Sequence, residues 1–217
     1  MSQQQKELTR RGARSRQSII AAAMSVIAEQ GSRASLASIG AVVNMTAAGL
    51  LHHFGSKNNL LLAVLEERDR IDAEMLRAIW EEGQPFLETL EALVDLNQTK
   101  PELVQLFTVL VGESASPKHP AHDHFARRYA DRHREALEVL QNEQRAGEIR
   151  SDVDLEEIVV LELAVMDGLQ IQWCLDSEVD MAARFRAFTR ILRQAIMVEP
   201  VGRPRWRRAL ARSSRSS

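Results

Sequence analysis

Residues 35–54, SLASIGAVVNMTAAGLLHHF, constrain the fold of this chain more than any other stretch. Leu36, Ile39 and Val43 recur at the spacing of one helix face. Asn44 follows them, and asparagine readily takes the left-handed backbone that ends a helix. The pattern therefore predicts a short helix that ends in a tight turn.

A second helix is expected directly after this turn, with a buried side and an outer side. Thr46 can cap its start, and Leu50 and Phe54 give it an apolar side at i, i+4 spacing. Gly40 on the first helix has no side chain, which lets the two helices cross closely. The outer side combines small residues with two imidazoles, which suits close approach to a DNA groove. The alternative is an ordinary helix pair in an all-helical protein. The residues expected to contact DNA in this unit are Ser35, Thr46, Ala47, Ala48, Gly49, His52 and His53.

Basic side chains stand on both sides of this helix-turn-helix pattern. Ser56 can cap the next helix, whose first backbone N–H groups favour an anion, and we expect Lys57 to hold a DNA phosphate there. Arg33, in the loop before the pattern, and Arg14 are placed to reach the phosphate backbone. Residues 1 to about 12 are polar and basic. We expect them to form a mobile arm that contacts DNA or, alternatively, a solvated tail without a role.

Residues 21–65 resemble the DNA-binding domain of the TetR family of bacterial transcription regulators. Asn44 stands where that family usually has glycine, and Gly40 where it usually has alanine. Leu51 and Gly49 replace hydroxyl-bearing residues that often touch phosphate in the family, so those two contacts are expected to be missing. The positions that carry the resemblance are Gly31, Ser35, Leu36, Ile39, Asn44, Met45, Thr46, Leu50, Leu51, His52, His53, Phe54, Ser56, Lys57, Leu60 and Leu61.

The resemblance implies an all-α fold, with an N-terminal three-helix helix-turn-helix DNA-binding domain joined to a larger C-terminal helical bundle for ligand binding and dimerisation. It also implies a transcriptional regulator that binds a palindromic operator in double-stranded DNA as a homodimer. Such a regulator most often acts as a repressor that a small-molecule effector releases from DNA.

The charge distribution divides the chain at the end of the helix-turn-helix pattern. The net charge is −2, but residues 1–57 carry +5, residues 58–198 carry −12 and residues 199–217 carry +5. The acidic part would be repelled by phosphate, so it is expected to face away from DNA. We therefore predict a DNA-binding domain over 1–57, an effector-binding and dimerisation domain over 58–198, and a disordered basic tail over 199–217.

The composition favours helices and argues against several other classes of protein. Ala, Leu, Glu and Arg are abundant and alternating β-branched residues are nearly absent, so no sheet is predicted. No Walker loop, GxGxxG, GxSxG or HExxH motif occurs, and neither an enzyme activity nor a cofactor is expected. A single cysteine, Cys174, excludes an internal disulfide. No apolar run is judged to reach the ~18 residues of a membrane span, so a cytoplasmic protein without a membrane partner is expected.

Three histidines lie close together in the acidic part. His119, His122 and His124 have spacings that do not put all three rings on one helix face. A metal-responsive regulator that uses this cluster or, with less support, a helical metal-dependent enzyme stays open as an alternative. A solvated helix start is the simpler interpretation, so no metal site is assigned.

Residues 58–82 form one long predicted helix that begins in the DNA-binding domain and ends inside the second domain. At 1.5 Å per residue it spans about 40 Å and is the natural mechanical link between the two domains. Large apolar side chains around it are candidates for an effector cavity, although each also suits an ordinary core. Few charges are expected on these faces, which favours an apolar or aromatic effector. The candidates are Trp80, Phe86, Phe107, Met166 and Trp173.

The last two predicted helices are candidates for a subunit interface. Residues 154–176 are apolar nearly all round, and apolar residues then repeat at heptad-like spacing over residues 181–195. The alternative is an ordinary core. A two-fold dimer would place two recognition helices about 34–36 Å apart, one turn of DNA. The resemblance likewise implies an interface made by the last two helices, and the predicted contact residues are Leu161, Gly168, Ile171, Met181, Phe185, Phe188 and Leu192.

Overall fold

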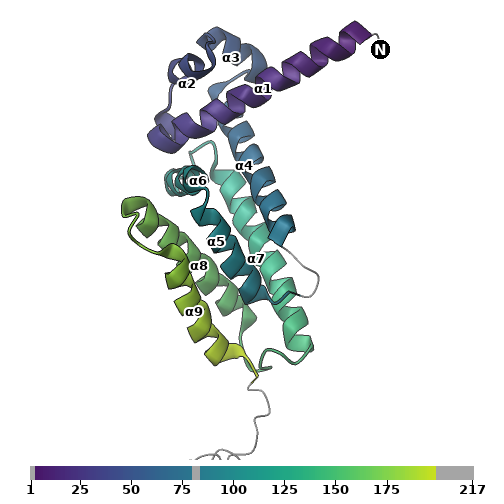
Figure 1. The fold of residues 1–217 in the computed structure, drawn as a ribbon, viewed down its shortest axis with the longest axis vertical. Coiled ribbons are helices and arrows are strands. Elements are labelled where there is room, and N and C mark those ends of the chain that lie inside the picture. The colour runs from purple at the N-terminus through teal and green to yellow at the C-terminus, as the bar shows by residue number, and fades with distance from the viewer. Residues whose placement is uncertain (1–2, 80–83, 199–217) are drawn as a thin grey trace, which may run out of the picture.

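The computed structural model describes residues 3–79 and 84–198. Over these ranges the chain forms a small helical head above a longer helical bundle (Figure 1). The described residues contain no β-strand, only an isolated bridge between Ile149 and Met197, and the all-α prediction is confirmed. The elements are α1 (Gln3–Gln30), the 3-10 turn η1 (Gly31–Arg33), α2 (Leu36–Val43), α3 (Ala47–Phe54), α4 (Lys57–Ile79), α5 (Phe86–Gln98), α6 (Pro101–Glu113), α7 (His122–Arg145), α8 (Leu155–Leu175) and α9 (Met181–Ile196).

The head contains the predicted helix-turn-helix, formed by α2 and α3. The Ser35 hydroxyl accepts the Ser38 N–H at 2.9 Å, and the Ser38 hydroxyl accepts the Ser35 N–H, so a reciprocal pair of bonds starts α2. Asn44 ends α2 with φ 52° and ψ 46°, the left-handed conformation expected for it. A Cβ on Gly40 would lie 2.3 Å from the Met45 carbonyl oxygen, so the turn requires a glycine there.

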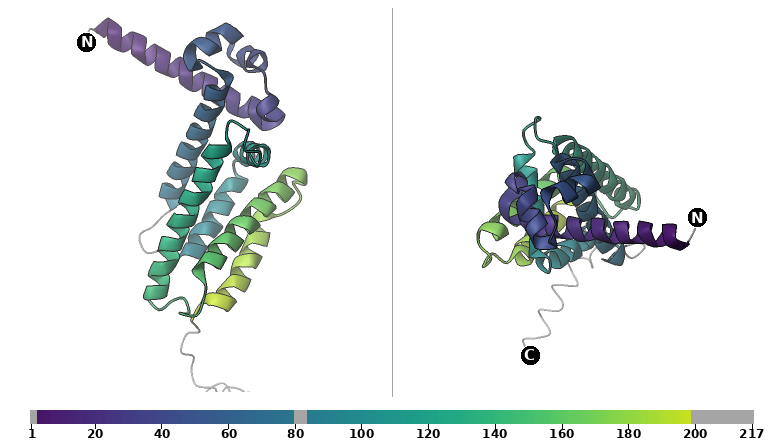
Figure 2. Two further views of the ribbon diagram at one scale, coloured as in Figure 1. Left: turned by 180° about the vertical axis from the view of Figure 1, so that it is seen from behind. Right: turned by 90° about the horizontal axis from the view of Figure 1, so that it is seen from above.

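The first helix is longer than the sequence predicts. The sequence predicts a mobile arm over residues 1 to about 12, with the first helix only after it, but α1 begins at Gln3. The segment before Ala13 is rich in Gln, Lys, Glu and Arg, which are good helix formers, and it contains no proline. Its polarity therefore does not prevent a helix. This part of α1 projects beyond the rest of the head (Figures 1 and 2).

One apolar core joins the head to the top of the bundle. Buried side chains of α1, α2 and α3 pack with those of α4 and with Leu106 and Leu110 of α6. The helix α4 runs from the head down into the bundle, as predicted, whereas α6 lies across the long axis and is seen end-on directly beneath the head (Figures 1 and 2). The head is therefore seated on two elements of the bundle, α4 and α6.

The other bundle helices, α5, α7, α8 and α9, run along the long axis of the molecule (Figure 1). Met181, Phe185 and Leu192 of α9 are buried within the single chain, and Phe188 is half-buried. Because α9 packs on α5 and α8, its heptad-like stripe faces the chain's own core. This burial corrects the prediction that the stripe contacts a second chain, since spacing shows only that residues share a face and not what covers it.

The outer faces of α8 and α9 expose apolar side chains instead. Leu161 is 53% exposed, Ile171 is 45% exposed and Ile191 is 64% exposed. By length and composition alone α8 is also apolar enough to cross a membrane, contrary to the expectation from the sequence. One such helix is weak evidence for a membrane segment, and here α8 packs against α6, α7 and α9.

Candidate functional site

The outer side of α3 is the candidate DNA-binding face. Leu50 and Phe54 are buried in the core of the head, as predicted from their spacing. Ala48 and His52 are exposed, and so is Leu51, which replaces the hydroxyl-bearing residue of the family. The other residues of α3 that are predicted to contact DNA are half-buried. They are Ala47, Gly49 and His53.

Two predicted contact residues also serve as helix caps. The Thr46 hydroxyl accepts the Gly49 N–H at 3.1 Å, and its own hydrogen is free to donate to a phosphate. The Ser35 hydroxyl accepts the Ser38 N–H and also lies 3.1 Å from the Ser38 hydroxyl oxygen, to which it donates. Thr46 therefore keeps a donor for DNA, whereas the groups of Ser35 are engaged within α2.

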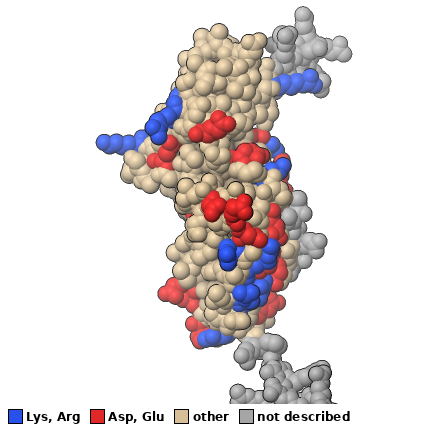
Figure 3. All heavy atoms as spheres, turned by 60° about the vertical axis from the view of Figure 1, so that its left-hand side comes forward, with Lys and Arg blue, Asp and Glu red and all other residues tan. Residues whose placement is uncertain are grey.

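The basic side chains predicted to hold phosphate lie at the edges of the head. Lys57, at the first position of α4, is exposed, and its Nζ donates to the Ser32 carbonyl oxygen at 2.6 Å. An ammonium group has three N–H donors, so two remain for a phosphate. Arg33 is exposed beside Ser32, and Arg14 is exposed on α1. On the face drawn in Figure 3, the tip of the head is free of Lys and Arg, which stand at its two edges.

Arg16 has a structural role that the sequence did not indicate. Its guanidinium lies 4.9 Å from the centre of the Phe54 ring, at a cation–π distance. The contact ties α1 to the end of α3.

Beside the shared apolar core, the head and the bundle meet at the backbone of Ser32. Its N–H donates to the Glu113 carboxylate at 2.8 Å, at the end of α6, and its carbonyl oxygen accepts from Lys57 of α4. Gly31 precedes it with φ +64°, and a Cβ there would lie 2.4 Å from the Glu113 carboxylate. We call this arrangement the Ser32 joint. Sequence reasoning missed it because Ser32 and Glu113 are 81 residues apart.

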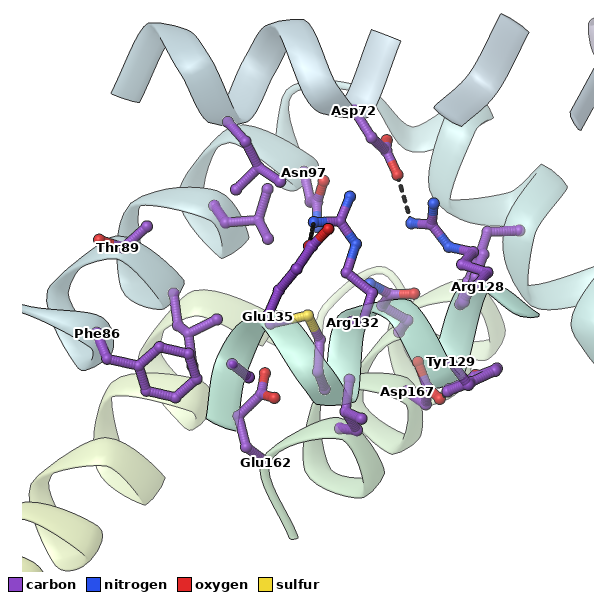
Figure 4. A pocket seen from close by; sticks show the side chains of 18 of the residues that line it. Asp72, Phe86, Thr89, Asn97, Arg128, Tyr129, Arg132, Glu135, Glu162 and Asp167 are labelled. Carbon is purple, nitrogen blue, oxygen red and sulfur yellow. Dashed lines mark hydrogen bonds and ion pairs between the residues drawn. The ribbon is translucent and has the colours of Figure 1, made fainter. Parts of the chain in front are cut away.

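The bundle encloses a cavity of about 480 Å³ between α4, α5, α6, α7 and α8 (Figure 4). Phe86, Phe107 and Met166, three of the predicted effector residues, line it. Trp173 does not, because its side chain packs into a separate apolar cluster. Trp80 lies outside the described residues.

The upper wall of the cavity carries a buried network of charged groups. Arg68 lies 2.8 Å from Asp72, and Arg128 of α7 donates to Asp72 at 2.7 Å and to Asp69. The Arg68 guanidinium also lies 4.3 Å from the centre of the Phe107 ring. Burial lowers the pKa of Arg68 to about 10, with Asp72 opposing the shift, so Arg68 stays charged at neutral pH. The prediction that few charges line the cavity is therefore wrong.

Glu162 of α8 lines the same cavity but differs from the other charged groups. Its side chain is only 2% exposed, and none of the described residues donates a hydrogen bond to its carboxylate. Burial raises the pKa of Glu162 to about 8, the charge of Asp167 raises it further, and Arg132 opposes the shift. Asp167 accepts a hydrogen bond from Tyr129, and burial raises the pKa of Asp167 as well. The cavity thus holds a carboxyl group that is mostly protonated at pH 7.

The three histidines, one before α7 and two in its first turn, bond to different groups. His119 Nδ1 lies 3.0 Å from the Ser114 hydroxyl, and His122 Nδ1 lies 2.9 Å from the Ser114 carbonyl oxygen. His124 Nε2 lies 3.0 Å from the Asp69 carboxylate. Over residues 3–79 and 84–198 no group of three or more His, Cys, Asp or Glu side chains has an arrangement that could hold a metal ion. The metal-responsive alternative is therefore not supported.

A helix-turn-helix head joined by a connecting helix to a helical bundle with a cavity is the architecture of a DNA-binding transcription regulator. The chain belongs to the TetR family. The model of the bacterial regulatory proteins of the tetR family matches residues 19–64, and that of the C-terminal domain of BetI-type transcriptional repressors matches residues 84–197. A comparison with curated proteins gives no match.

Solved structures share this fold at low sequence identity. A putative transcriptional regulator from Saccharomonospora viridis in complex with choline has a TM-score of 0.74 at 21% identity, over 86% of this chain and 100% of that chain. A TetR-family regulator from Agrobacterium tumefaciens has a TM-score of 0.71 at 18% identity, over 86% and 100%. SmeT, the repressor of a multidrug efflux pump of Stenotrophomonas maltophilia, has a TM-score of 0.68 at 18% identity, over 87% and 93%.

The buried carboxyl group of Glu162 makes stability depend on pH in a predictable direction. Its pKa is about 8 in the folded chain against 4.5 for an ordinary glutamate, so the folded state binds the extra proton between these values. The contribution of this group to the free energy of unfolding is fully present below about pH 4.5. It is lost as the pH rises through 8. Glu162→Gln removes the group, so wild type should lose stability relative to this variant between pH 5 and 8. Urea denaturation across this range measures the difference.

Glu157→Gln, an exposed change on the same helix, is the control, and parallel curves for wild type and Glu162→Gln would contradict the assignment.

Proposed function

We propose that this chain is an effector-responsive repressor that binds a palindromic operator as a homodimer. The observation that carries the proposal is that one helix serves both sites. Lys57 starts α4 at the DNA-binding face, and Arg68 and Asp72 of the same helix line the cavity. A molecule bound in the cavity therefore contacts the helix that carries the phosphate-binding group.

The proposed DNA contacts combine α3 in the major groove with phosphate contacts around it. His52 and the small side chain of Ala48 are exposed on α3, and Lys57, Arg33 and Arg14 supply positive charge. Because the tip of the head carries few charges, the phosphate contacts at its edges supply most of the electrostatic attraction. Affinity should therefore fall steeply as the salt concentration rises. A function on operator DNA places the protein in the cytoplasm.

The proposed effect of ligand binding runs through α4 and α6. Arg68 of α4 and Phe107 of α6 touch each other in the cavity wall, and the same two helices hold the Ser32 joint at their head ends. A ligand that changes the packing of Arg68 on Phe107 moves α4 relative to α6. Because the head rests on these two helices, its position changes as well. Such coupling requires different affinities for the two arrangements, typically ~1–3 kcal/mol.

The proposed dimer interface is the exposed apolar face of α8 and α9. Leu161, Ile171 and Leu175 follow one another at helical spacing on α8, and a Cβ on Gly168, between them, would meet open space. Ile191 of α9 extends this face. Two such helix pairs would cover each other's apolar side chains in a four-helix contact. This interface keeps three of the predicted residues and drops those buried in the single chain.

The relatives support two further parts of the proposal, the binding of a small-molecule effector and the repression of transcription. One solved structure of this fold is described in complex with choline, so a bundle of this kind can hold a small molecule. The matching C-terminal model is that of transcriptional repressors, and SmeT is described as a repressor. Repression released by an effector is therefore the form of regulation that we propose here.

Lys57→Gln tests the DNA-binding face. The variant loses the positive charge but keeps an N–H donor for Ser32, so the Ser32 joint can persist. DNA affinity should fall for all sequences, and the slope of log K against log salt should shrink by about one unit. Binding to DNA from upstream of its own gene is measured by fluorescence anisotropy at several salt concentrations. Lys100→Ala, at an exposed position on the bundle, should change neither quantity, and an unchanged slope in Lys57→Gln would contradict the phosphate contact.

Leu161→Asp combined with Ile191→Asp tests the dimer interface. Both side chains are exposed in the single chain, so the changes do not disturb its core, but they would bury two charges in the proposed contact. Light scattering should show a dimer for the wild type and a monomer for the variant, with unchanged circular dichroism. Val42→Asp, an exposed apolar position on the head, should remain a dimer. A double variant that stays dimeric places the interface elsewhere.

A further inference from the structure

The α8 wall of the cavity includes a row of three residues on one helix face, with Leu163 and Asp167 beside them. Glu162, Met166 and Gln170 follow at four-residue intervals and all line the cavity. Glu162 is 2% exposed and Gln170 is 4% exposed. Two polar side chains of the cavity wall are thus almost completely withdrawn from water.

Both polar side chains present acceptors that the described residues leave unused. The Gln170 amide oxygen is buried without a hydrogen-bond partner, and Glu162 accepts no hydrogen bond within the described part of the chain. A buried acceptor without a donor is costly, so a bound molecule that supplies donors is favoured here.

Three of the four arginines that line the cavity are paired with carboxylates, although Arg68 Nε is buried without a hydrogen-bond partner among the described residues. Arg68 and Arg128 are held by carboxylates of α4, and Arg132 bonds to Glu135 at 3.1 Å. Figure 4 shows Arg132 turned toward Glu135, while the Glu162 carboxylate points into the space between the helices without a partner. The charged groups that line the cavity with Glu162 are Asp167 on α8, Arg128, Arg132 and Glu135 on α7, and Arg68, Asp72 and Arg77 on α4, whereas the lining residues of α5 and α6 are uncharged.

The remaining walls of the cavity suit an apolar body. Phe86, Leu90 and Leu93 of α5 face Val139 of α7 and Leu163 of α8 across it. A ligand that fits these walls is amphipathic, with one polar group and a hydrocarbon part.

We propose that the effector is an amphipathic amine whose ammonium group pairs with Glu162 and takes the place of a proton on that carboxyl group. The proposal rests on the proposed function, in that it takes the cavity to be the effector site. Glu162 is then the residue that selects the charge of the ligand. An anionic group beside Glu162 is disfavoured, because it would lie near the Asp167 carboxylate and would keep Glu162 protonated.

The proton balance of this exchange is simple. In the free chain burial keeps the pKa of Glu162 at about 8, so the carboxyl group carries its proton at pH 7. An ammonium group nearby favours the carboxylate, and its N–H donates to a carboxylate oxygen. The carboxyl O–H bond breaks and its proton passes to the solvent. One cation is bound and about one proton is released, with no change in oxidation state.

Three probes with one carbon skeleton and different charges test the selection. 4-Phenylbutylamine is a cation, 4-phenylbutanol is neutral and 4-phenylbutyrate is an anion at pH 7. Isothermal titration of the full chain without DNA should show the amine binding more tightly than the alcohol by at least about tenfold, the range expected for a charged hydrogen bond. The acid should bind most weakly.

Two matched variants test whether Glu162 is the residue that sets the preference for the amine. Glu162→Gln has the same shape without the charge, so it should bind the amine and the alcohol with affinities within about twofold of each other. Glu157→Gln makes the same change at an exposed position of α8 and should keep the wild-type preference. Melting temperatures of the three proteins verify that each is folded.

The number of protons released per amine bound is measured by repeating the titration in phosphate and Tris buffers, whose ionisation enthalpies differ. The wild type should release close to one proton per amine bound at pH 7, less at pH 9, and Glu162→Gln should release none.

Equal affinity for the amine and the alcohol, a preference that survives in Glu162→Gln, or failure of all three probes to bind would each overturn the proposal. These results are independent of DNA. A wild type that selects the amine but never binds operator DNA would instead overturn the proposed function.

Discussion

The backbone of Ser32 is held through both its N–H and its carbonyl oxygen, and these two bonds, above the shared apolar core, help to fix the position of the head. Glu113 at the end of α6 accepts its N–H, and Lys57 at the start of α4 donates to its carbonyl oxygen. Gly31 beside it has φ +64°, a conformation that favours glycine, and a Cβ there would displace the Glu113 carboxylate. In the proposed function, the Ser32 joint is the place where the bundle sets the position of the DNA-binding face.

The same two helices meet again at the cavity. Arg68 of α4 stacks on Phe107 of α6, and Asp72 fixes Arg68 in place. At 1.5 Å per residue, the distance along α6 from Phe107 to Glu113 is about 9 Å, so a small change at the cavity needs only a short rigid path to reach Ser32. The buried acceptor Glu162 lies on the opposite wall, on α8. A ligand held between the two walls therefore contacts both the selecting group and the helices that seat the head.

Local signals in the sequence predicted the helix-turn-helix well, because its determinants lie within a few residues of one another. Ser35 and Ser38 close a capping box, Asn44 adopts the left-handed conformation, and Gly40 lies against the turn. Other features escaped prediction because they depend on distant partners. Periodicity placed the apolar residues of α9 on one face, but only the fold shows that α5 covers them. The charged lining was missed because residues such as Arg68 and Glu162 look like surface groups until neighbouring helices enclose them.

Replacing Glu113 tests the central claim that the Ser32 joint carries the signal from cavity to DNA. Operator affinity is measured with and without an effector, with 4-phenylbutylamine as the first probe, for wild type, Glu113→Ala and the exposed control Glu102→Ala. In wild type and control the effector should weaken DNA binding by about fivefold or more, within the usual range of allosteric coupling. Glu113→Ala should bind the effector and bind DNA, yet show the same DNA affinity with and without it. A Glu113→Ala protein that responds to the effector as wild type does would contradict this account.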